Sequence, residues 1–323
     1  MLLRRTRTIP VAAFACAATA WSGACAAGLT TVLMGDESAP YAEFVQQLRK
    51  MQEAGSHLDL IRLTAGQPAS GPFSGAPSAV RPRGAVPADA PVTMAVGVAA
   101  ARSAIERPGQ DPLVLAMLSR IDYESLKTNP AMRHPARQIG VLLRDPAMAD
   151  QLALIDAVMP HKRRLGVVAT GESAPILNEL QSAAQGWDLQ VEFAPDAKSL
   201  AAALRVLVPR SDALLILPDR IGDDQAATLA VLRAGAGAGL PVFGASDGLV
   251  RSGGLAAAVS TPAQLAQQAL ALGQKLAANI GPRGVVVEAA TPATVRVNTT
   301  VARGLGLRLP EERELTERVT AIR

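Results

Sequence analysis

Between Arg164 and Gly254 the chain repeats one hydrophobic pattern three times. A short apolar run is followed by a turn of small and polar residues, and then by apolar residues at helical spacing; the apolar runs are Leu165–Ala169, Ala213–Leu217 and Pro241–Gly244. This alternation is typical of a parallel sheet covered by helices. Because the carboxyl ends of parallel strands meet at one edge, we predict that the three turns line one crevice.

The same alternation occurs earlier in the chain. Apolar runs predict strands over 30–34, 57–63, 92–96 and 113–118, and apolar residues at helical spacing predict a helix over 41–52. These elements make a first lobe. The run Gln138–Leu143 predicts a strand that opens a second lobe, and Met148–Met159 predicts its first helix.

Further elements follow the repeated pattern, so the chain must cross between the lobes more than once. A long helix begins at Thr261-Pro262, and strands are predicted at 285–287 and 294–297. We therefore predict an α/β fold of two Rossmann-like lobes with parallel sheets joined by a hinge. The first lobe comprises residues 28–135, completed by about 257–283, and the second comprises 136–256, completed by about 284–323.

Two segments do not fit either lobe. Residues 1–27 contain Arg4, Arg5 and Arg7, then an apolar run and a stretch of small residues, which is the layout of a signal peptide. Residues 64–91 are rich in Pro, Gly, Ala and Ser, and we predict a flexible surface insertion there. The mature protein is thus expected in the periplasm.

Charge and cysteine content limit the kinds of partner and cross-link that we expect. The formal net charge of +4 includes three arginines of the predicted signal peptide, so a nucleic-acid partner is not expected. Both cysteines, Cys16 and Cys25, lie in that segment, which leaves the exported part without a disulfide. A lipoprotein anchored through Cys25 is the alternative location, but the residues Trp21–Ala24 lack the aliphatic residue expected three positions before such a cysteine.

Two short motifs have ordinary explanations. Gly244–Gly248 matches G-x-S-x-G, the nucleophile motif of α/β-hydrolases, but that fold places its histidine after the serine and all three histidines here precede it. Gly235–Gly239 follows a predicted helix instead of a strand, which favours a helix end over a dinucleotide site. No spacing typical of metal ligands occurs. We expect no catalysis, no cofactor and no metal.

Two longer stretches carry a resemblance. The run Leu240–Ala256 (LPVFGASDGLVRSGGLA) and the tail Arg296–Pro310 (RVNTTVARGLGLRLP) are similar to the substrate-binding protein family of ABC transporters, which includes tryptophan- and tyrosine-binding members. The resemblance implies the periplasmic binding protein type 1 fold and solute binding between the lobes. It implies as partners a small solute and an ABC permease of the inner membrane, with the binding protein as a monomer.

The expected solute is amino-acid-like or another carboxylate, held by turn residues of both lobes. We predict its carboxylate beside Thr170 and Ser173, at the start of a helix that contains Pro175, with Arg120 as a second contact. On this hypothesis Ser173→Ala weakens solute binding. The full predicted set is Gly35, Asp36, Ser38, Gly97, Ser119, Arg120, Thr170, Glu172, Ser173, Asp219, Ser246 and Asp247.

A second function class stays open. The Pro/Gly-rich segment 64–91 stands where the family usually has a helix, and Ser260-Thr261-Pro262 stands where it tends to have an Asp-Tyr pair. These departures favour a non-transport periplasmic sensor or accessory protein with a degenerate pocket. Fold alone does not distinguish the two classes.

Overall fold

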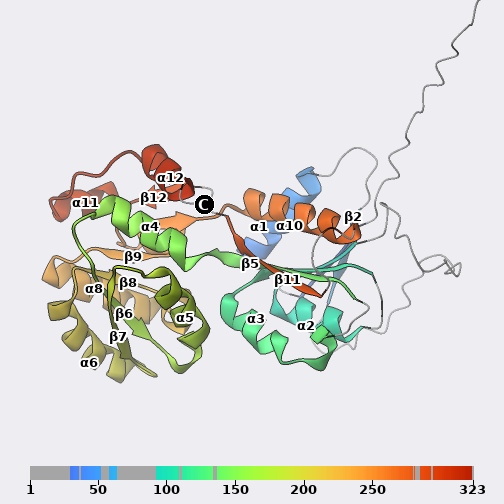
Figure 1. Cartoon of the computed structure of the whole chain (residues 1–323), viewed down its shortest axis with the longest axis horizontal. Helices are drawn as coiled ribbons and strands as arrows, with labels where there is room; N and C mark the ends of the chain where they lie inside the picture. Colours follow the sequence, from blue (N-terminus) through green and yellow to red (C-terminus); the bar gives the residue numbers. More distant parts are fainter. Residues whose placement is uncertain are drawn as a thin grey trace, which may run out of the picture.

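The computed structural model describes most of the chain after the predicted signal peptide (Figure 1). The described residues are 30–35, 38–51, 58–63, 92–107, 109, 111–133, 137–278, 280, 284–291 and 294–321. The predicted signal peptide 1–27 and the predicted insertion 64–91 lie outside them. Within the described ranges, the structure contains no helix with the length and apolar character needed to cross a membrane.

The first lobe is built on a six-stranded parallel sheet. The strand order is β11-β5-β4-β3-β1-β2, with β1 Thr30–Met34, β2 Leu58–Arg62, β3 Val92–Val96, β4 Leu113–Leu118, β5 Ile139–Pro146 and β11 Val285–Ala290. Every described residue of β4 is buried, because helices cover both faces of the sheet. Helices α1 (Ala39–Met51) and α10 (Pro262–Ala277) pack on one face, and α2 (Val98–Glu106) and α3 (Arg120–Lys127) on the other.

The second lobe repeats this arrangement. Its sheet has the order β12-β10-β9-β8-β6-β7, with β6 Arg164–Ala169, β7 Asp188–Phe193, β8 Ala213–Leu215, β9 Val242–Gly244, β10 Ala256–Val259 and β12 Thr294–Val297. All neighbours are parallel except β12, which is antiparallel to β10. The strands predicted from the repeated pattern are β6, β8 and β9, and they lie side by side in the order β9-β8-β6.

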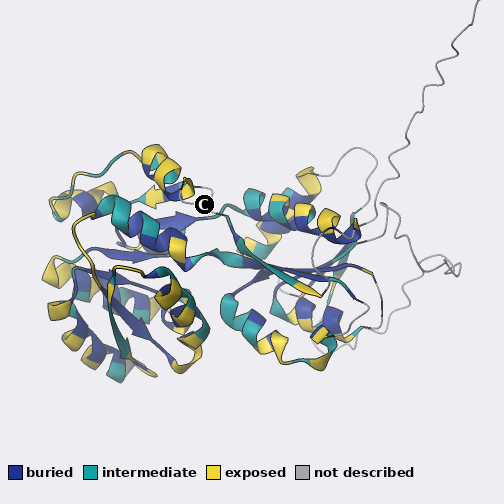
Figure 2. Cartoon of the chain, viewed as in Figure 1, coloured by how far each residue is buried: buried dark blue, intermediate teal, exposed yellow. Residues whose placement is uncertain are grey.

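Helices again cover both faces of the second sheet. Helices α4 (Met148–Val158), α5 (Ala174–Ala183) and α12 (Glu312–Thr320) pack on one face, and α6 (Ala197–Leu207) and α8 (Gln225–Ala238) on the other. Short helices α7 (Arg220–Asp223), α9 (Asp247–Arg251) and α11 (Thr299–Gly304) complete the lobe. Figure 2 shows the buried residues along the strands and on the inward sides of the helices.

Three connections join the lobes: β5 to α4, β10 to α10, and β11 to β12. They lie close together, since the hydroxyl of Ser260 in the second connection donates to the carbonyl of Thr291 in the third. In the second lobe, Gln151 of α4 donates to the carbonyl of Ala258 at 2.8 Å and accepts from its N–H at 3.2 Å. Helix α4 and strand β10, at which the first and second connections enter the second lobe, are thus fixed to each other.

The predicted lobe boundaries need correction at three strands. Residues 138–143 were expected to open the second lobe, but β5 pairs with β4 and β11 inside the first sheet. Residues 257–259 were expected in the first lobe, but they belong to β10, which pairs with β9 and β12 in the second sheet. Residues 285–290 were expected in the second lobe, but β11 is an edge strand of the first. A strand's sequence gives its apolar character but does not specify which sheet it joins. The two-lobed α/β fold itself is confirmed.

Candidate functional site

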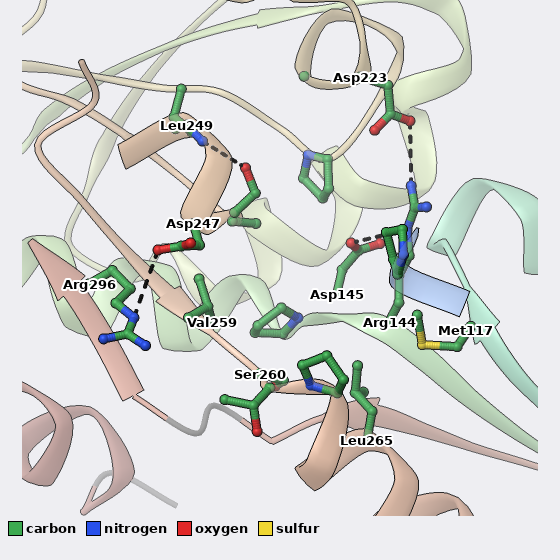
Figure 3. Close-up of a pocket in the computed structure, with 18 of the residues that line it drawn as sticks. Met117, Arg144, Asp145, Asp223, Asp247, Leu249, Val259, Ser260, Leu265 and Arg296 are labelled. Carbon is green, nitrogen blue, oxygen red and sulfur yellow. Dashed lines mark hydrogen bonds and ion pairs between the residues drawn. The ribbon is translucent and has the colours of Figure 1, made fainter. Parts of the chain in front are cut away.

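A pocket of about 570 Å³ lies between the two lobes, at the carboxyl ends of their strands (Figure 3). The first lobe contributes residues from α1, β4 and α10, the second lobe contributes the segments after β8, β9 and β10, and two interlobe connections supply the rest. The lining residues are Pro40, Glu43, Met117, Arg144, Asp145, Pro146, Ile216, Leu217, Pro218, Gly222, Asp223, Ala245, Ser246, Asp247, Leu249, Val259, Ser260, Thr261, Pro262, Leu265 and Arg296.

Part of the pocket wall is aliphatic. Met117 and Leu265 of the first lobe and Leu249 and Val259 of the second line it, and no aromatic side chain of the described residues lines the pocket. Met117 has φ of 61°, the only positive φ at a non-glycine residue among those described. The register between β4 and β5 shifts at this position, so the strand bulges toward the pocket. A methionine held in this backbone region is strained, which is typical of functional sites.

Ionised side chains lie beside the aliphatic ones (Figure 3). Arg144 of β5 reaches Asp223 of α7 across the junction, with Nη2 3.4 Å from Oδ2, and its Nε lies 3.6 Å from Oδ1 of Asp145. Burial alone would lower the pKa of Arg144, but the two carboxylates raise it above its usual value. Arg144 is therefore a fixed cation that holds part of the first lobe to the second.

The adjacent carboxyl group has an unusual environment. The side chain of Asp145 is 16% exposed, and its Oδ2 is buried without a hydrogen-bond partner in the structure. Burial raises the pKa of Asp145 to about 7, although Arg144 acts in the opposite direction. Asp145 is thus a titratable group on the pocket wall within the physiological pH range.

Two predicted site residues, Ser246 and Asp247, do line the pocket. The Oγ of Ser246 accepts the N–H of Leu249 at 3.1 Å and caps α9, which agrees with the predicted turn role. Asp247 pairs with Arg251, and its Oδ1 lies 3.8 Å from Nε of Arg296. Its negative charge is therefore already balanced by cations.

The predicted carboxylate site beside Thr170 is not available to a solute. Ser173 is fully buried, and its hydroxyl donates to Asp219 while accepting the N–H of Thr170 at 2.9 Å. Asp219 is 1% exposed and also accepts the N–H groups of Ile221 at 2.9 Å and Gly222 at 3.3 Å. These residues form an internal network that joins β6 to α7. The sequence placed them correctly at the strand ends, but it could not show that their polar groups satisfy one another.

The first-lobe turn after β4 is also engaged internally. Ser119 is buried and forms a capping box with Asp122, in which its Oγ accepts the N–H of Asp122 at 3.0 Å. Arg120 donates to Glu179 of α5 at 2.6 Å, and the other oxygen of Glu179 accepts the N–H of Met148 at 2.9 Å. Arg120 therefore joins the lobes outside the pocket instead of contacting a solute inside it.

The remaining predicted residues are dispersed. Gly35, Ser38 and Glu172 are exposed and do not line the pocket, and Asp36 lies outside the described residues. Gly97 is buried with φ of 82°, and a Cβ atom there would approach the ring of Tyr41 to 3.3 Å. Position 97 requires glycine because of the positive φ of the turn and the close packing of α1.

The important residues that the sequence interpretation missed are Arg144 and Asp145. They follow the apolar run Ile139–Leu143 and stand at the carboxyl end of a strand, which is the same criterion that selected the other candidates. Assigning that strand to the wrong lobe removed them from consideration. Met117 carries no signal in the sequence, because its role depends on a local register shift.

The interlobe ion pair gives a testable expectation. Arg120→Ala and Glu179→Ala should each destabilise the protein, and Glu179→Ala by more, because it also leaves the N–H of Met148 without its acceptor. A double-mutant cycle in urea unfolding should give a coupling energy of about 1 kcal/mol. The exposed pair Arg163–Asp156 within the second lobe is the control, with a coupling energy near zero. Equal coupling in the two cycles would contradict a special role for the interlobe pair.

Two α/β lobes around a pocket at their junction define a two-lobed binding protein of the periplasmic binding protein type 1 class. The chain belongs to the ABC transporter substrate-binding protein family, since the family model described as "ABC transporter substrate binding protein" matches residues 86–317. The resemblance inferred from the stretches 240–256 and 296–310 is confirmed. Among the residues described, no group of three or more His, Cys, Asp or Glu side chains is arranged to hold a metal ion.

Solved structures give the same fold. A conserved domain protein from Vibrio cholerae is 22% identical, with a TM-score of 0.55 over 91% of this chain and 98% of its own. An ABC domain in complex with L-Trp from Streptococcus pneumonia is 16% identical, with a TM-score of 0.53 and coverage of 88% and 96%. A ligand-free, open substrate-binding protein with adhesive properties from Clostridium difficile is 14% identical, with a TM-score of 0.63 and coverage of 88% and 96%. No curated protein matches the chain.

Proposed function

We propose that this protein is the periplasmic solute-binding component of an ABC importer and that it holds a small amino-acid-like solute in the interlobe pocket. The observation that carries the proposal is the pocket itself, which combines an aliphatic wall with ionised groups and is lined by both lobes and their connections. Its volume of about 570 Å³ is within the range usual for small-molecule sites. Closure of two lobes on such a solute is the usual way for a hinge to bury a ligand.

The kind of solute is inferred from the lining. Zwitterions suit a site with both carboxylate and guanidinium groups, whereas sugars are usually held against aromatic rings, which the described lining lacks. The L-Trp bound by the ABC domain from Streptococcus pneumonia supports an amino-acid-like class. The aliphatic wall of this pocket favours an aliphatic body over an aromatic one.

We infer the location of the protein from its N-terminal sequence and its transport partner from the family. The three arginines, the apolar run and the small residues of 1–27 support export to the periplasm, where a monomeric binding protein would deliver its solute to an inner-membrane permease. The protein would carry out no catalysis of its own.

A thermal-shift screen tests the binding function. At a solute concentration of 100 times the dissociation constant, binding should add about 2.7 kcal/mol to the free energy of unfolding, and the melting temperature should rise by several degrees. The screen would contain the proteinogenic amino acids, simple amines, organic acids and sugars. Stabilisation by no compound would favour the rival function, a sensor or accessory protein with a degenerate pocket.

A further inference from the structure

One carboxyl group on the pocket wall has an oxygen atom without a hydrogen-bond partner. Of the four acidic side chains among the described lining residues, Asp247 pairs with Arg251, while Asp145 and Asp223 share Arg144. The Oδ2 of Asp145 is excluded from solvent and accepts no hydrogen bond from the described residues. A buried carboxylate oxygen without a donor is costly, so such a group is either protonated or meets a donor that arrives with the ligand.

The protein's own cations do not neutralise this group fully. Arg144 lies 3.6 Å from Oδ1, but it also reaches Asp223, so its single charge serves two carboxyl groups. Asp122 of α3 and Asp223 of α7 both act on Asp145 as like charges and raise its pKa, while the backbone N–H of Arg120 acts to lower it. Burial has the largest effect and favours the protonated form. The surroundings therefore leave an anionic Asp145 short of positive charge.

Resting on the proposed solute-binding function, we propose that Asp145 binds the protonated amino group of the solute. Asp145 stands at the carboxyl end of β5, just before the first interlobe connection, on the wall of the pocket, and 16% of its side chain is exposed. The terminal torsion of an aspartate is broad, so rotation about it can turn a carboxylate oxygen toward the pocket. An ammonium group placed there supplies the donor that Oδ2 lacks.

The rest of the lining defines the remainder of the solute. Met117, Leu249 and Leu265 offer an aliphatic surface for its body (Figure 3). Arg144 and Arg296 are both already paired with carboxylates, so a carboxylate of the solute would have to compete for them. We infer that the amino group makes the larger contribution and that a primary amine without a carboxylate still binds.

A series of three matched compounds tests whether the amino group contributes more to binding than the carboxylate does. L-leucine carries both groups, isoamylamine lacks the carboxylate and isocaproate lacks the amino group, with the same aliphatic body in each. Calorimetry at pH 8 with the full-length mature protein should detect binding of L-leucine and isoamylamine, and binding of isocaproate at least about 30-fold weaker, the loss expected for one buried charge pair. Tight binding of isocaproate would overturn the proposal while leaving the solute-binding function intact.

Asp145→Asn tests the residue itself. The variant should bind the amines at least about 30-fold more weakly than the wild type. The control is Asp156→Asn, which removes the same charge from an exposed position outside the pocket and should leave affinity unchanged. Circular dichroism confirms that both variants are folded. Unchanged amine affinity in folded Asp145→Asn would reject the assignment.

The same proposal predicts a pH dependence. Because the pKa of Asp145 without solute is about 7, amine affinity should reach a plateau near pH 8, where the solute is still an ammonium ion, and should fall about tenfold per pH unit below 7. Asp145→Asn should remove this slope. If L-leucine and its analogues fail to bind, the amines found in the broader screen replace them, and a screen whose hits all lack an amino group overturns the proposal. A screen with no hits rejects the solute-binding function instead.

Discussion

Asp145→Asn is expected to raise the free energy of unfolding of the solute-free protein at pH 8 by up to about 4 kcal/mol. This value corresponds to the difference between the pKa of about 7 in the folded protein and the ordinary value of 3.8. In the folded wild type the buried carboxyl group ionises above pH 7, and the surrounding charges and hydrogen bonds offset only a small part of the cost of burying its charge. The asparagine amide has nearly the shape of a protonated aspartic acid and cannot ionise. The same variant thus gains stability and loses amine binding.

The sign of the effect follows from proton linkage. Between about pH 4 and pH 7 the folded wild type keeps a proton on Asp145 that the unfolded chain has lost, so its stability falls as the pH rises through this window. The advantage of Asp145→Asn should therefore be absent near pH 4 and complete at pH 8. Urea unfolding at several pH values measures it, with Asp156→Asn as the control. Parallel pH profiles for wild type and Asp145→Asn would show that Asp145 ionises normally.

Asp219→Ala is expected to lower the free energy of unfolding by about 4 kcal/mol. The substitution leaves the Ser173 hydroxyl and the N–H groups of Ile221 and Gly222 without their acceptor in a buried site. Burial raises the pKa of Asp219, and the hydrogen bonds from Ser173, Gly222 and Ile221 offset this effect only in part. Asp219→Asn keeps one acceptor oxygen and should cost less.

A matched control separates this network from ordinary helix capping. Asp224 caps α8 by accepting the N–H of Ala227 at 2.7 Å, but its position is exposed. Asp224→Ala should therefore cost about 1 kcal/mol, the usual value for a lost N-cap. Urea unfolding of both variants gives the comparison. Equal losses would mean that Asp219 acts only as a cap and that burial of its network adds nothing.

Much of the fold could be predicted from the sequence because it depends on local pattern. The strand limits of β1, β3, β4 and β12 were predicted to the residue, and Thr261-Pro262 correctly marked the start of α10. Asp196 directly precedes α6 and caps it through bonds to Lys198 and Ser199, two and three residues away. Apolar runs, helical spacing and capping residues act over a few positions, so they can be recognised without the tertiary structure.

The sequence pattern did not predict to which of the two sheets a strand belongs. The apolar run of β5 is the same whether its neighbour is β4 or β6, and only the packing of the whole chain pairs it with β4 and β11. The predicted boundary between the lobes came too early in the chain, because the hydrophobic pattern indicates strands and helices but not which strands pair with each other. The location of Arg144 and Asp145 at the junction depends on this pairing.

The sequence by itself determined the α/β class, the two lobes, the family resemblance and the presence of polar turns at the strand ends. Only the tertiary structure decided which of those turns meet a pocket. Ser173 and Asp219 satisfy each other inside the second lobe, Arg120 pairs with Glu179, and Asp145 is left with an unpaired oxygen on the pocket wall. The physical reason is that a polar side chain is available to a ligand only if no other group of the protein already satisfies it, and those partners are distant in sequence.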